Sequence, residues 1–345
     1  MSSAPTPAEA AAEVELAAGR ISSRLYRTPL QQAFWLSSDS NVFLKLESEQ
    51  VTNSFKARGA LNKVLSLSPS ERSKGIITAS TGNHALAMAN ACTVVRQETE
   101  GGDNFGFEIV LPETASSAKV DLLRAMGAPL RLHGSDCLEA ELEALREARE
   151  GGKCYVSPYN DLQVLAGQGT VAREILEDIS APPAAVFVPV GGGGLIAGIA
   201  ACIKARSPET KVIGCSPVND AHMAHSVRKG EFVDVETYKE NGGITISEGT
   251  AGAVEEGSIT FGLCQKLVDQ WIELTEEEIG TAVVDMLVHH HKAIEGAAGL
   301  GIAGFRKLAP EYAGKTVAIV ICGGNVKAEI LRDLLNKYLP AKPDA

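Results

Sequence analysis

The sequence predicts an α/β protein with parallel β-sheet, because short apolar runs alternate with helical patterns along most of the chain. Two further observations agree with this class. With 345 residues, of which 45% are hydrophobic, the chain can bury a substantial core in two domains or one large one. Several apolar runs also end in turns of small and polar residues, where open α/β sheets bind their ligands.

The predicted elements follow one another in a strand-then-helix order. The strands are short runs of apolar residues, many of them β-branched, and we expect them at Ile76–Ala79, Glu108–Leu111, Pro129–Leu132, Ala185–Val190, Val212–Cys215 and Thr316–Ile321. The helices have longer patterns of helical period, within Met1–Arg20 and at Asn83–Val94, Ser116–Met126, Cys137–Glu150, Leu165–Asp178, Leu195–Ala205, Glu276–Ile294 and Val326–Tyr338.

Composition narrows the class of function. A net charge of −11 disfavours nucleic acid or an anionic membrane as partner. No apolar run approaches the roughly 18 residues that span a bilayer, and the N-terminal segment has neither a basic start nor an apolar centre. The cysteines are odd in number and lack C-x-x-C spacing, which favours a reduced protein over a disulfide framework or a zinc site. We therefore expect a cytoplasmic location.

Three segments share one design, in which a strand runs into a turn of small residues and then into a helix. They are Thr78–His84, Pro189–Leu195 and Ile321–Asn325. Glycine-rich turns let a ligand approach the backbone closely, and helix N-termini offer unpaired N–H groups to an anion. The pattern predicts a ligand with separated negative groups.

The glycine run Gly191–Gly194 is the clearest phosphate signal. A flexible turn is the plain alternative. A dinucleotide fingerprint is a second one, since Gly192, Gly194 and Ala197 match its loose G-x-G-x-x-A form. That fingerprint requires an acid about 20 residues further on, but the next strand ends at Ser216-Pro217. A single phosphate group is the better interpretation.

Lys56 lies between polar turn residues and a helical run. By itself such a lysine would be an ordinary solvated helix residue. Beside a phosphate loop it gains a functional interpretation, because a lysine amine whose pKa is lowered can form a Schiff base with an aldehyde cofactor.

Four ordered motifs give the chain a specific resemblance: Ser54-Phe55-Lys56-x-Arg58-Gly59-Ala60, Ser80-Thr81-Gly82-Asn83-His84, Gly191-Gly192-Gly193-Gly194-Leu195 and Cys322-Gly323-Gly324-Asn325. In order and approximate spacing the chain resembles the threonine/serine dehydratase and serine racemase family, from about Arg27 to Tyr338. This family consists of fold-type II pyridoxal-phosphate enzymes, similar to the tryptophan synthase β chain. The resemblance implies two open parallel-sheet domains with flanking helices.

The resemblance also implies roles for the site residues. Lys56 would bind pyridoxal 5'-phosphate covalently and act as the base at the substrate Cα, with Phe55 beside it. Asn83 would bond the cofactor's 3-hydroxyl, and the glycine loop with the Leu195 amide would hold the phosphate. Cys322 would lie beside the pyridine nitrogen. The substrate carboxylate would bind at the turn of Ser80, Thr81, Gly82, Asn83 and His84.

The residue type at position 322 affects the expected mechanism. A thiol is a weak acid with a reference pKa of about 8.5, so it should leave the pyridine nitrogen largely unprotonated. Such a ring stabilises a carbanion poorly. Proton removal by Lys56 should then be coupled to loss of the β-hydroxyl, which favours elimination. A buried small hydrophobe at a strand end is the plain alternative for Cys322.

The resemblance thus predicts an ammonia-lyase that converts L-threonine, L-serine or a related β-hydroxy amino acid to a 2-oxo acid. Serine racemases carry serine where Thr81 stands, which weakens a racemase with side dehydratase activity as an alternative. Cysteine synthases carry threonine where His84 occurs. Hydroxyaspartate dehydration stays open, as does a catalytically silent pyridoxal-phosphate-binding protein. Few residues follow Tyr338, so the C-terminal regulatory region of biosynthetic threonine dehydratases is not expected.

No metal site is expected. The cation site of several relatives aligns its acidic positions with Ser216 and His222, and neither is a carboxylate. Asp220 is a lone alternative. His289, His290 and His291 are consecutive on a predicted helix, so they point in different directions. Glu295 is either a cofactor-side acid or a helix-terminal surface residue.

The expected division places residues 1–74 and 154–345 in a large domain that binds the cofactor, and residues 75–153 in a small domain. The cleft between them should close over a small amino-acid substrate. Because the family favours dimers, a homodimer is expected.

Overall fold

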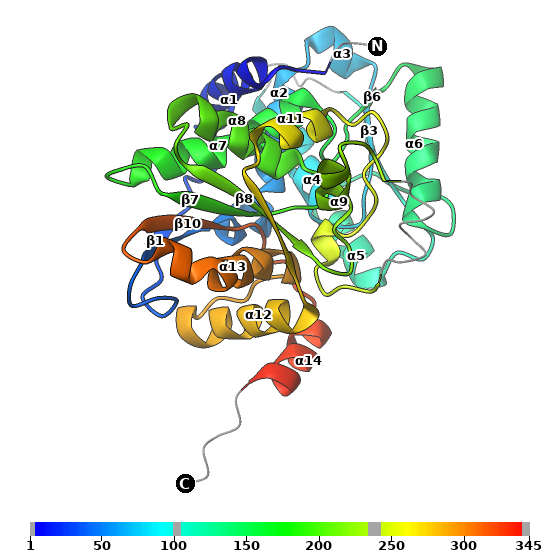
Figure 1. Ribbon diagram of the computed structural model, residues 1–345. Helices are drawn as coiled ribbons and strands as arrows, with labels where there is room; N and C mark the ends of the chain where they lie inside the picture. Colours follow the sequence, from blue (N-terminus) through cyan, green and yellow to red (C-terminus); the bar gives the residue numbers. More distant parts are fainter. Residues whose placement is uncertain (1–3, 99–104, 234–242, 340–345) are drawn as a thin grey trace.

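The computed structural model describes residues 4–98, 105–233 and 243–339. Its larger sheet has six strands in the order β1-β2-β10-β7-β8-β9 (Figure 1). All neighbours run parallel except β1, which pairs antiparallel with β2 at one edge. The strands are β1 (Leu30–Gln32), β2 (Asn41–Leu46), β7 (Ala185–Pro189), β8 (Lys211–Pro217), β9 (Gln270–Leu274) and β10 (Thr316–Ile321).

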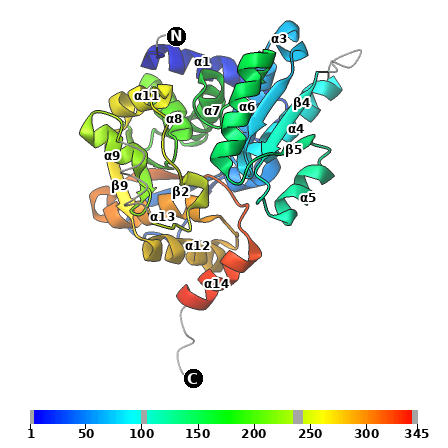
Figure 2. The same ribbon diagram turned by 90° about the vertical axis from the view of Figure 1, so that its right-hand side faces the viewer.

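The smaller sheet has four parallel strands in the order β5-β4-β3-β6. Figure 2 shows it from the side, with α4, α5 and α6 around it. Its strands are β3 (Ile76–Ala79), β4 (Phe107–Leu111), β5 (Leu130–Leu132) and β6 (Cys154–Tyr155).

Helices cover both faces of the larger sheet. Figure 1 shows α1, α7, α8 and α11 on one face and α12 and α13 on the other. The α-helices of the described residues are α1 (Pro7–Ile21), α2 (Lys56–Ser66), α3 (Pro69–Ser73), α4 (Asn83–Glu98), α5 (Ser117–Ala125), α6 (Cys137–Gly151), α7 (Leu162–Asp178), α8 (Gly194–Arg206), α9 (His222–Lys229), α11 (Ile259–Leu267), α12 (Glu276–His290), α13 (Gly296–Leu308) and α14 (Ala328–Tyr338). Short 3₁₀ turns lie at η1 (Glu47–Glu49), η2 (Val51–Asn53), η3 (Glu248–Thr250) and η4 (Ala309–Tyr312).

Small residues let the helices above the larger sheet approach closely. Helices α7 and α8 meet at Gly169 and Gly198, where a Cβ on Gly198 would lie 2.0 Å from the Leu165 carbonyl oxygen. Strand β7 below them is apolar throughout, and every one of its residues is buried. Strands covered on both faces are expected to be continuously apolar, and this arrangement fixes the position of the turn between β7 and α8.

The structure confirms the predicted fold class, and all six predicted strands are present. Strands β1, β2, β6 and β9 and helices α3, α9, α11 and α13 were not predicted. The predicted helix Glu276–Ile294 is too long, because α12 ends at His290 and His291 adopts a left-handed conformation with φ 57°. Only two of the three histidines are therefore helical.

The predicted domain boundary needs one adjustment. Strand β6, at Cys154–Tyr155, pairs with β3 and so belongs to the smaller sheet, although the prediction assigned it to the large domain. The division into domains otherwise stays a prediction. Among the described helices, none combines the length and apolar character needed to cross a bilayer.

Candidate active site

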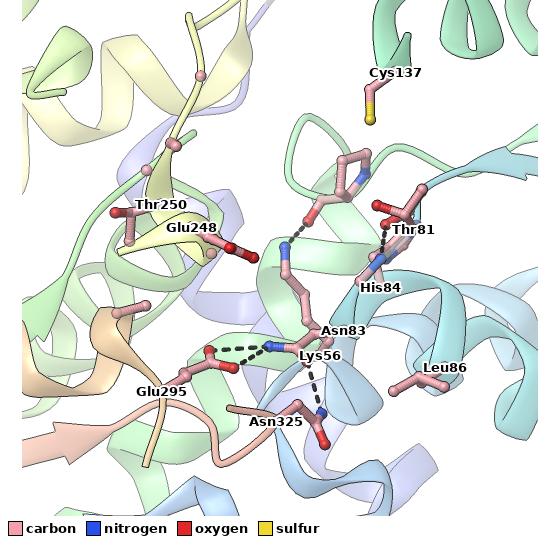
Figure 3. A pocket seen from close by; sticks show the side chains of 18 of the residues that line it. Lys56, Thr81, Asn83, His84, Leu86, Cys137, Glu248, Thr250, Glu295 and Asn325 are labelled. Atoms are coloured by element: carbon pink, nitrogen blue, oxygen red, sulfur yellow. Dashed lines mark hydrogen bonds between the residues drawn. The ribbon is translucent and has the colours of Figure 1, made fainter. Parts of the chain in front are cut away.

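A cavity of about 980 Å³ opens at the carboxyl ends of the strands of both sheets (Figure 3). The turns that follow β3, β7 and β10 all border it. Every predicted site residue lines this one cavity: Phe55, Lys56, Ser80, Thr81, Gly82, Asn83, His84, Gly191, Gly192, Gly193, Gly194, Leu195 and Cys322. Residues from distant parts of the chain are thus brought together at one place.

Lys56 is the first residue of α2 and is anchored next to the end of β10. The Phe55 backbone N–H donates to the Cys322 carbonyl oxygen at 3.1 Å, and Ser54 forms an isolated β-bridge with Gly323. The Lys56 ammonium reaches across the cavity, where Nζ donates to the Pro158 carbonyl oxygen at 2.7 Å. Burial lowers the pKa of Lys56 to about 8, against opposing effects of Cys322 and Glu295.

The loop before Lys56 is held in an unusual conformation. Thr52 and Asn53 both have positive φ, 64° and 55°, which is costly for residues with a side chain. Asn325 Nδ2 donates to the Thr52 carbonyl oxygen at 2.9 Å, and the Gly324 N–H donates to that of Asn53 at 2.9 Å. The Cys322-Gly323-Gly324-Asn325 motif therefore holds the loop that leads into Lys56.

Asn83 is fixed by two side chains. Its Nδ2 donates to both carboxylate oxygens of Glu295 at 3.0 Å, and its Oδ1 accepts from Asn325 Nδ2 at 2.7 Å (Figure 3). Burial raises the pKa of Glu295. Glu295 lines the cavity, so the second sequence alternative, a surface residue at a helix end, is wrong, whereas a role beside the cofactor stays a prediction.

Cys322 lies beside the same carboxylate. Its Sγ is 3.9 Å from Glu295 Oε1, and the residue is 2% exposed. Burial and the neighbouring Glu295 raise the pKa of the thiol well above its usual range. Cys322 is therefore held as a neutral thiol.

The glycine loop is a cradle with no room for side chains. Gly193 has φ 85° and is the N-cap of α8, whose first turn carries no acidic residue. A Cβ on Gly191 would lie 2.7 Å from the Thr250 carbonyl oxygen, and one on Gly192 would lie 2.5 Å from the Tyr159 ring. The free N–H groups of the helix start can bind an anion there.

The turn after β3 presents backbone N–H groups to the cavity and no charged side chain. Ser80 Oγ accepts from the Gly82 N–H at 3.2 Å. His84 is 3% exposed, and its Nε2 lies 3.2 Å from the Val156 carbonyl oxygen. Burial, followed by the nearby Lys56, lowers the pKa of His84 to about 3. His84 is thus a neutral residue that packs on the smaller sheet, and it brings no positive charge to a bound carboxylate.

The residues considered for a metal have other partners. Ser216 Oγ donates to the Val190 carbonyl oxygen at 3.3 Å, and His222 Nδ1 accepts from the Val254 N–H at 3.0 Å. His289 stacks on Trp35, whereas His290 Nε2 lies 3.0 Å from Gln31 Oε1. Within the three described ranges, no group of three His, Cys, Asp or Glu side chains is placed to hold a metal ion.

Tyr159 and Thr250 border the cavity without having been predicted from sequence. Tyr159 follows β6, a two-residue strand whose pattern is too short to recognise. Thr250 lies in the loop Gly249-Thr-Ala-Gly252, which is outside the four motifs.

The residues fit pyridoxal phosphate. A lysine of lowered pKa, a glycine cradle at a helix start and a neutral thiol border one cavity, and together they define the class of protein as a pyridoxal-phosphate enzyme. The family model described as "Pyridoxal-phosphate dependent enzyme" matches residues 21–323, so the chain belongs to this family.

Named relatives narrow the class to the threonine/serine dehydratases and serine racemases. The chain is 39% identical to an L-threonine ammonia-lyase of Thermotoga maritima over 320 residues, which is 91% of this chain and 75% of the relative. It is 38% identical to the catabolic L-threonine dehydratase TdcB of Staphylococcus aureus, over 91% of this chain and 88% of the relative.

Solved structures agree in fold. A processed form of threonine deaminase isoform 2 from Solanum lycopersicum superposes with a TM-score of 0.84 and 31% identity, over 95% of this chain and 86% of that chain. Serine racemase from Dictyostelium discoideum gives a TM-score of 0.81 and 29% identity, over 92% and 98%. The fold is that of the fold-type II pyridoxal-phosphate enzymes.

Proposed function

We propose that this protein is a pyridoxal-phosphate-dependent ammonia-lyase that converts L-threonine, and L-serine, to a 2-oxo acid and ammonia. The observation that carries the proposal is the placement of Lys56 Nζ in a cavity bordered by the glycine cradle and the Cys322 thiol. The L-threonine ammonia-lyase and dehydratase names of the relatives support threonine as substrate.

Each residue has a part in this proposal. The glycine loop and the Leu195 N–H would hold the cofactor phosphate, Asn83 its 3-hydroxyl and Phe55 the start of the lysine helix. When bound, the cofactor supplies a covalent link to the substrate amino group that makes the Cα proton acidic. The backbone of the turn at Ser80–Gly82 would hold the substrate carboxylate.

Lys56 would then take the Cα proton. With a pKa of about 8, roughly a tenth of its amine is unprotonated at pH 7, far more than for an exposed lysine. Because the Cys322 thiol is a poor acid, the ring nitrogen beside it would stay unprotonated and a free carbanion would be unfavourable. This favours loss of the β-hydroxyl together with the proton.

Racemisation is the second candidate. It is favoured by the serine racemase neighbours and by the Thr81 hydroxyl at the cavity wall, which could protonate the opposite face of Cα. A catalytically silent binder would also need the Lys56 amine to hold the cofactor, so it is disfavoured instead by the L-threonine ammonia-lyase and dehydratase names of the relatives. Hydroxyaspartate is a further possible substrate.

We also propose a homodimer in a reducing, cytoplasmic compartment. The seven scattered cysteines are all free, which supports a reducing environment. The small domain at residues 75–153, extended by β6, would move against the rest of the chain when substrate binds.

A substrate panel tests this function. Purified holoenzyme would be given L- and D-threonine, L- and D-serine and 3-hydroxyaspartate, and the 2-oxo acid, ammonia and each enantiomer would be measured together. We expect L-threonine to yield 2-oxobutanoate and ammonia in equal amounts, with little D-allo-threonine, which is the product of inversion at Cα. Racemised product in excess of 2-oxo acid would favour the second candidate, and no change in any amino acid would favour the silent binder.

A further inference from the structure

The segment Ser247–Ser258, which we name the strap, covers the glycine loop. The Thr250 backbone fills the space beside Gly191, and residues Glu248–Ala253 form one wall of the cavity (Figure 3). Just beyond the strap, Thr260 Oγ1 donates to the Gly192 carbonyl oxygen at 2.7 Å. The strap is therefore in direct contact with the cradle that would hold the cofactor phosphate.

The outer end of the strap is tied to the far side of the glycine loop. The Tyr159 ring packs against Gly192, its Cβ and backbone lie beside Gly194, and its hydroxyl accepts from the Glu255 N–H at 3.3 Å. Asn160 Nδ2 donates to Glu255 Oε1 at 2.8 Å. The strap and Tyr159 thus enclose the glycine loop from two sides.

The middle of the strap is held by residues at and just before the start of α9. Asp220 Oδ2 accepts from the Gly252 N–H at 2.8 Å, and His222 Nδ1 accepts from the Val254 N–H at 3.0 Å. His222 is 2% exposed, and its Nε2 lies 3.1 Å from the Val233 carbonyl oxygen. Both imidazole nitrogens are engaged with backbone.

These contacts fix the state of the imidazole. Since Val254 donates to Nδ1, that nitrogen carries a lone pair, and Nε2 carries the hydrogen that it donates to Val233. A neutral ring of one tautomer therefore ties the strap to the end of α9. If Nδ1 were protonated, its N–H would face the Val254 N–H, and the hydrogen bond between them would be lost.

We propose that His222 is a positioning residue that holds the strap over the glycine loop and thereby controls how tightly the site retains a phosphate monoester. Val254, which it anchors, is four residues from Thr250, whose backbone closes the cradle. The inference rests on the cofactor site of the proposed function and not on the choice of substrate, so it stands even if L-threonine is not turned over.

Two near-isosteric variants separate the two bonds of His222. In His222→Asn the side-chain oxygen can take the place of Nδ1 and still accept from Val254, while the bond to Val233 is lost. In His222→Gln the amide N–H can replace Nε2 toward Val233, while the Val254 N–H loses its acceptor. Each variant thus loses one of the two hydrogen bonds of His222, and comparing them shows which bond matters.

The readout is cofactor affinity, measured by absorbance titration of each apoprotein with pyridoxal phosphate and with pyridoxal, which lacks the phosphate. We expect His222→Gln to raise the Kd for pyridoxal phosphate roughly 10-fold, because a buried N–H is left without a partner. His222→Asn should stay within about 3-fold of the wild type. Neither variant should change the Kd for pyridoxal.

Several outcomes would overturn the proposal: an unchanged Kd in His222→Gln, equal loss in both variants, or equal loss for both ligands, which would indicate general damage to the fold. If His222→Gln does not fold, Asp220→Ala removes the neighbouring anchor at Gly252 and should weaken pyridoxal phosphate selectively. A lack of such an effect would equally contradict the role of the strap. If a His222 variant lost lyase activity while its cofactor affinity stayed normal, the result would count against His222 as an anchor of the strap. A wild-type protein without lyase activity would instead contradict the proposed function.

Discussion

Lys56 owes its chemistry to burial at the first turn of α2. An exposed lysine has a pKa of about 10.4, whereas burial lowers the pKa of Lys56 to about 8. Its partner is a backbone carbonyl oxygen, that of Pro158, and not a carboxylate that would keep it charged. A lysine in this setting is prepared to react with an aldehyde.

Replacing Lys56 with alanine should remove turnover while leaving the fold intact. We expect kcat for L-threonine to fall at least about 1,000-fold, since both the covalent anchor and the base are lost. Formation of 2-oxobutanoate is the measurement, and the exposed Lys266 gives a matched control variant, Lys266→Ala. Wild-type ammonia release by Lys56→Ala would rule out the mechanism.

The lowered pKa of Lys56 predicts how cofactor uptake depends on pH. The neutral amine is the reactive form, so the rate at which apoprotein binds pyridoxal phosphate should rise with pH and level off above about 8. Stopped-flow absorbance measures this rate. Nα-acetyl-lysine, measured in parallel, should continue to rise beyond pH 10. Identical profiles would mean that burial does not alter the amine.

At the residue scale, the sequence was informative where the motif has a fixed local spacing. Lys56, Asn83, the glycine loop and Cys322 were predicted from motifs whose residues are neighbours both in sequence and in space, and all of them line the cavity. Their roles toward the cofactor stay predictions. The Glu295–Asn83 contact could not be found in this way, because it joins residues far apart in the chain and depends on how α13 packs. His84 was assigned to the substrate turn, and its burial on the smaller sheet was not predictable from its position beside Asn83.

At the element scale, the packing of α7 on α8 depends on Gly198. Gly198→Ala would place a Cβ 2.0 Å from the Leu165 carbonyl oxygen, so the helices would have to separate. We expect a loss of about 1–3 kcal/mol in the free energy of unfolding. Gly262→Ala in α11 is the control, because a Cβ there meets nothing within 4 Å and should stabilise by up to about 1 kcal/mol. Urea unfolding of both variants distinguishes them, and equal effects would contradict the packing argument.

A buried ionic cluster supports the helix that begins with Lys56. Arg58 is 1% exposed, and it pairs with Glu47 at 2.7 Å and with Glu174 at 2.6 Å. Glu174 also pairs with the buried Lys45 at 2.6 Å. Charges in such a cluster depend on one another, because each would be costly to bury alone.

Arg58→Met should therefore destabilise the protein by about 3–5 kcal/mol, because it leaves Glu47 buried without its cation. The double variant Arg58→Met/Glu47→Gln removes that charge and should recover part of the loss. Urea unfolding monitored by circular dichroism measures both. A double variant no more stable than Arg58→Met would show that the unpaired charge is not the cause.

The hydrophobic pattern of each helix or strand decided whether it could be predicted from the sequence. The buried parallel strands β3, β7 and β10 are almost wholly apolar and were found easily. Strand β2 was missed because Lys45, a fully buried lysine in an ion pair, interrupts its apolar run. Strand β9, with the sequence QWIEL, is half-buried except at Leu274 and has too weak a pattern. Helix α13 is rich in glycine, which disfavours helices locally, so its packing against α12, β7 and β10 defines it.

At the scale of the whole molecule, the site is shared between two sheets. The turn at Ser80–His84 extends from the smaller sheet, whereas the glycine loop and Cys322 extend from the larger one. A ligand that contacts both turns links the two parts of the chain. Its binding free energy is then added to the stability of the folded state.

Pyridoxal phosphate should accordingly raise the melting temperature of the apoprotein by several degrees. At a free concentration of about 100 times Kd the stabilisation is about 2.7 kcal/mol. Differential scanning calorimetry measures it, with pyridoxal and inorganic phosphate as separate controls that each fill only part of the site. A melting temperature unchanged by the cofactor would contradict a site shared by both sheets.

If Lys56 holds the cofactor, reduction of the Schiff base will fix the cofactor on this residue. Holoenzyme reduced with borohydride and then digested should yield one modified peptide, in which the Lys56 amine carries a phosphopyridoxyl group identified by mass spectrometry. We predict this modification on Lys56 at close to one group per chain, and its disappearance when L-threonine is present in excess before reduction. Modification of another lysine, or of none, would show that Lys56 does not hold the cofactor.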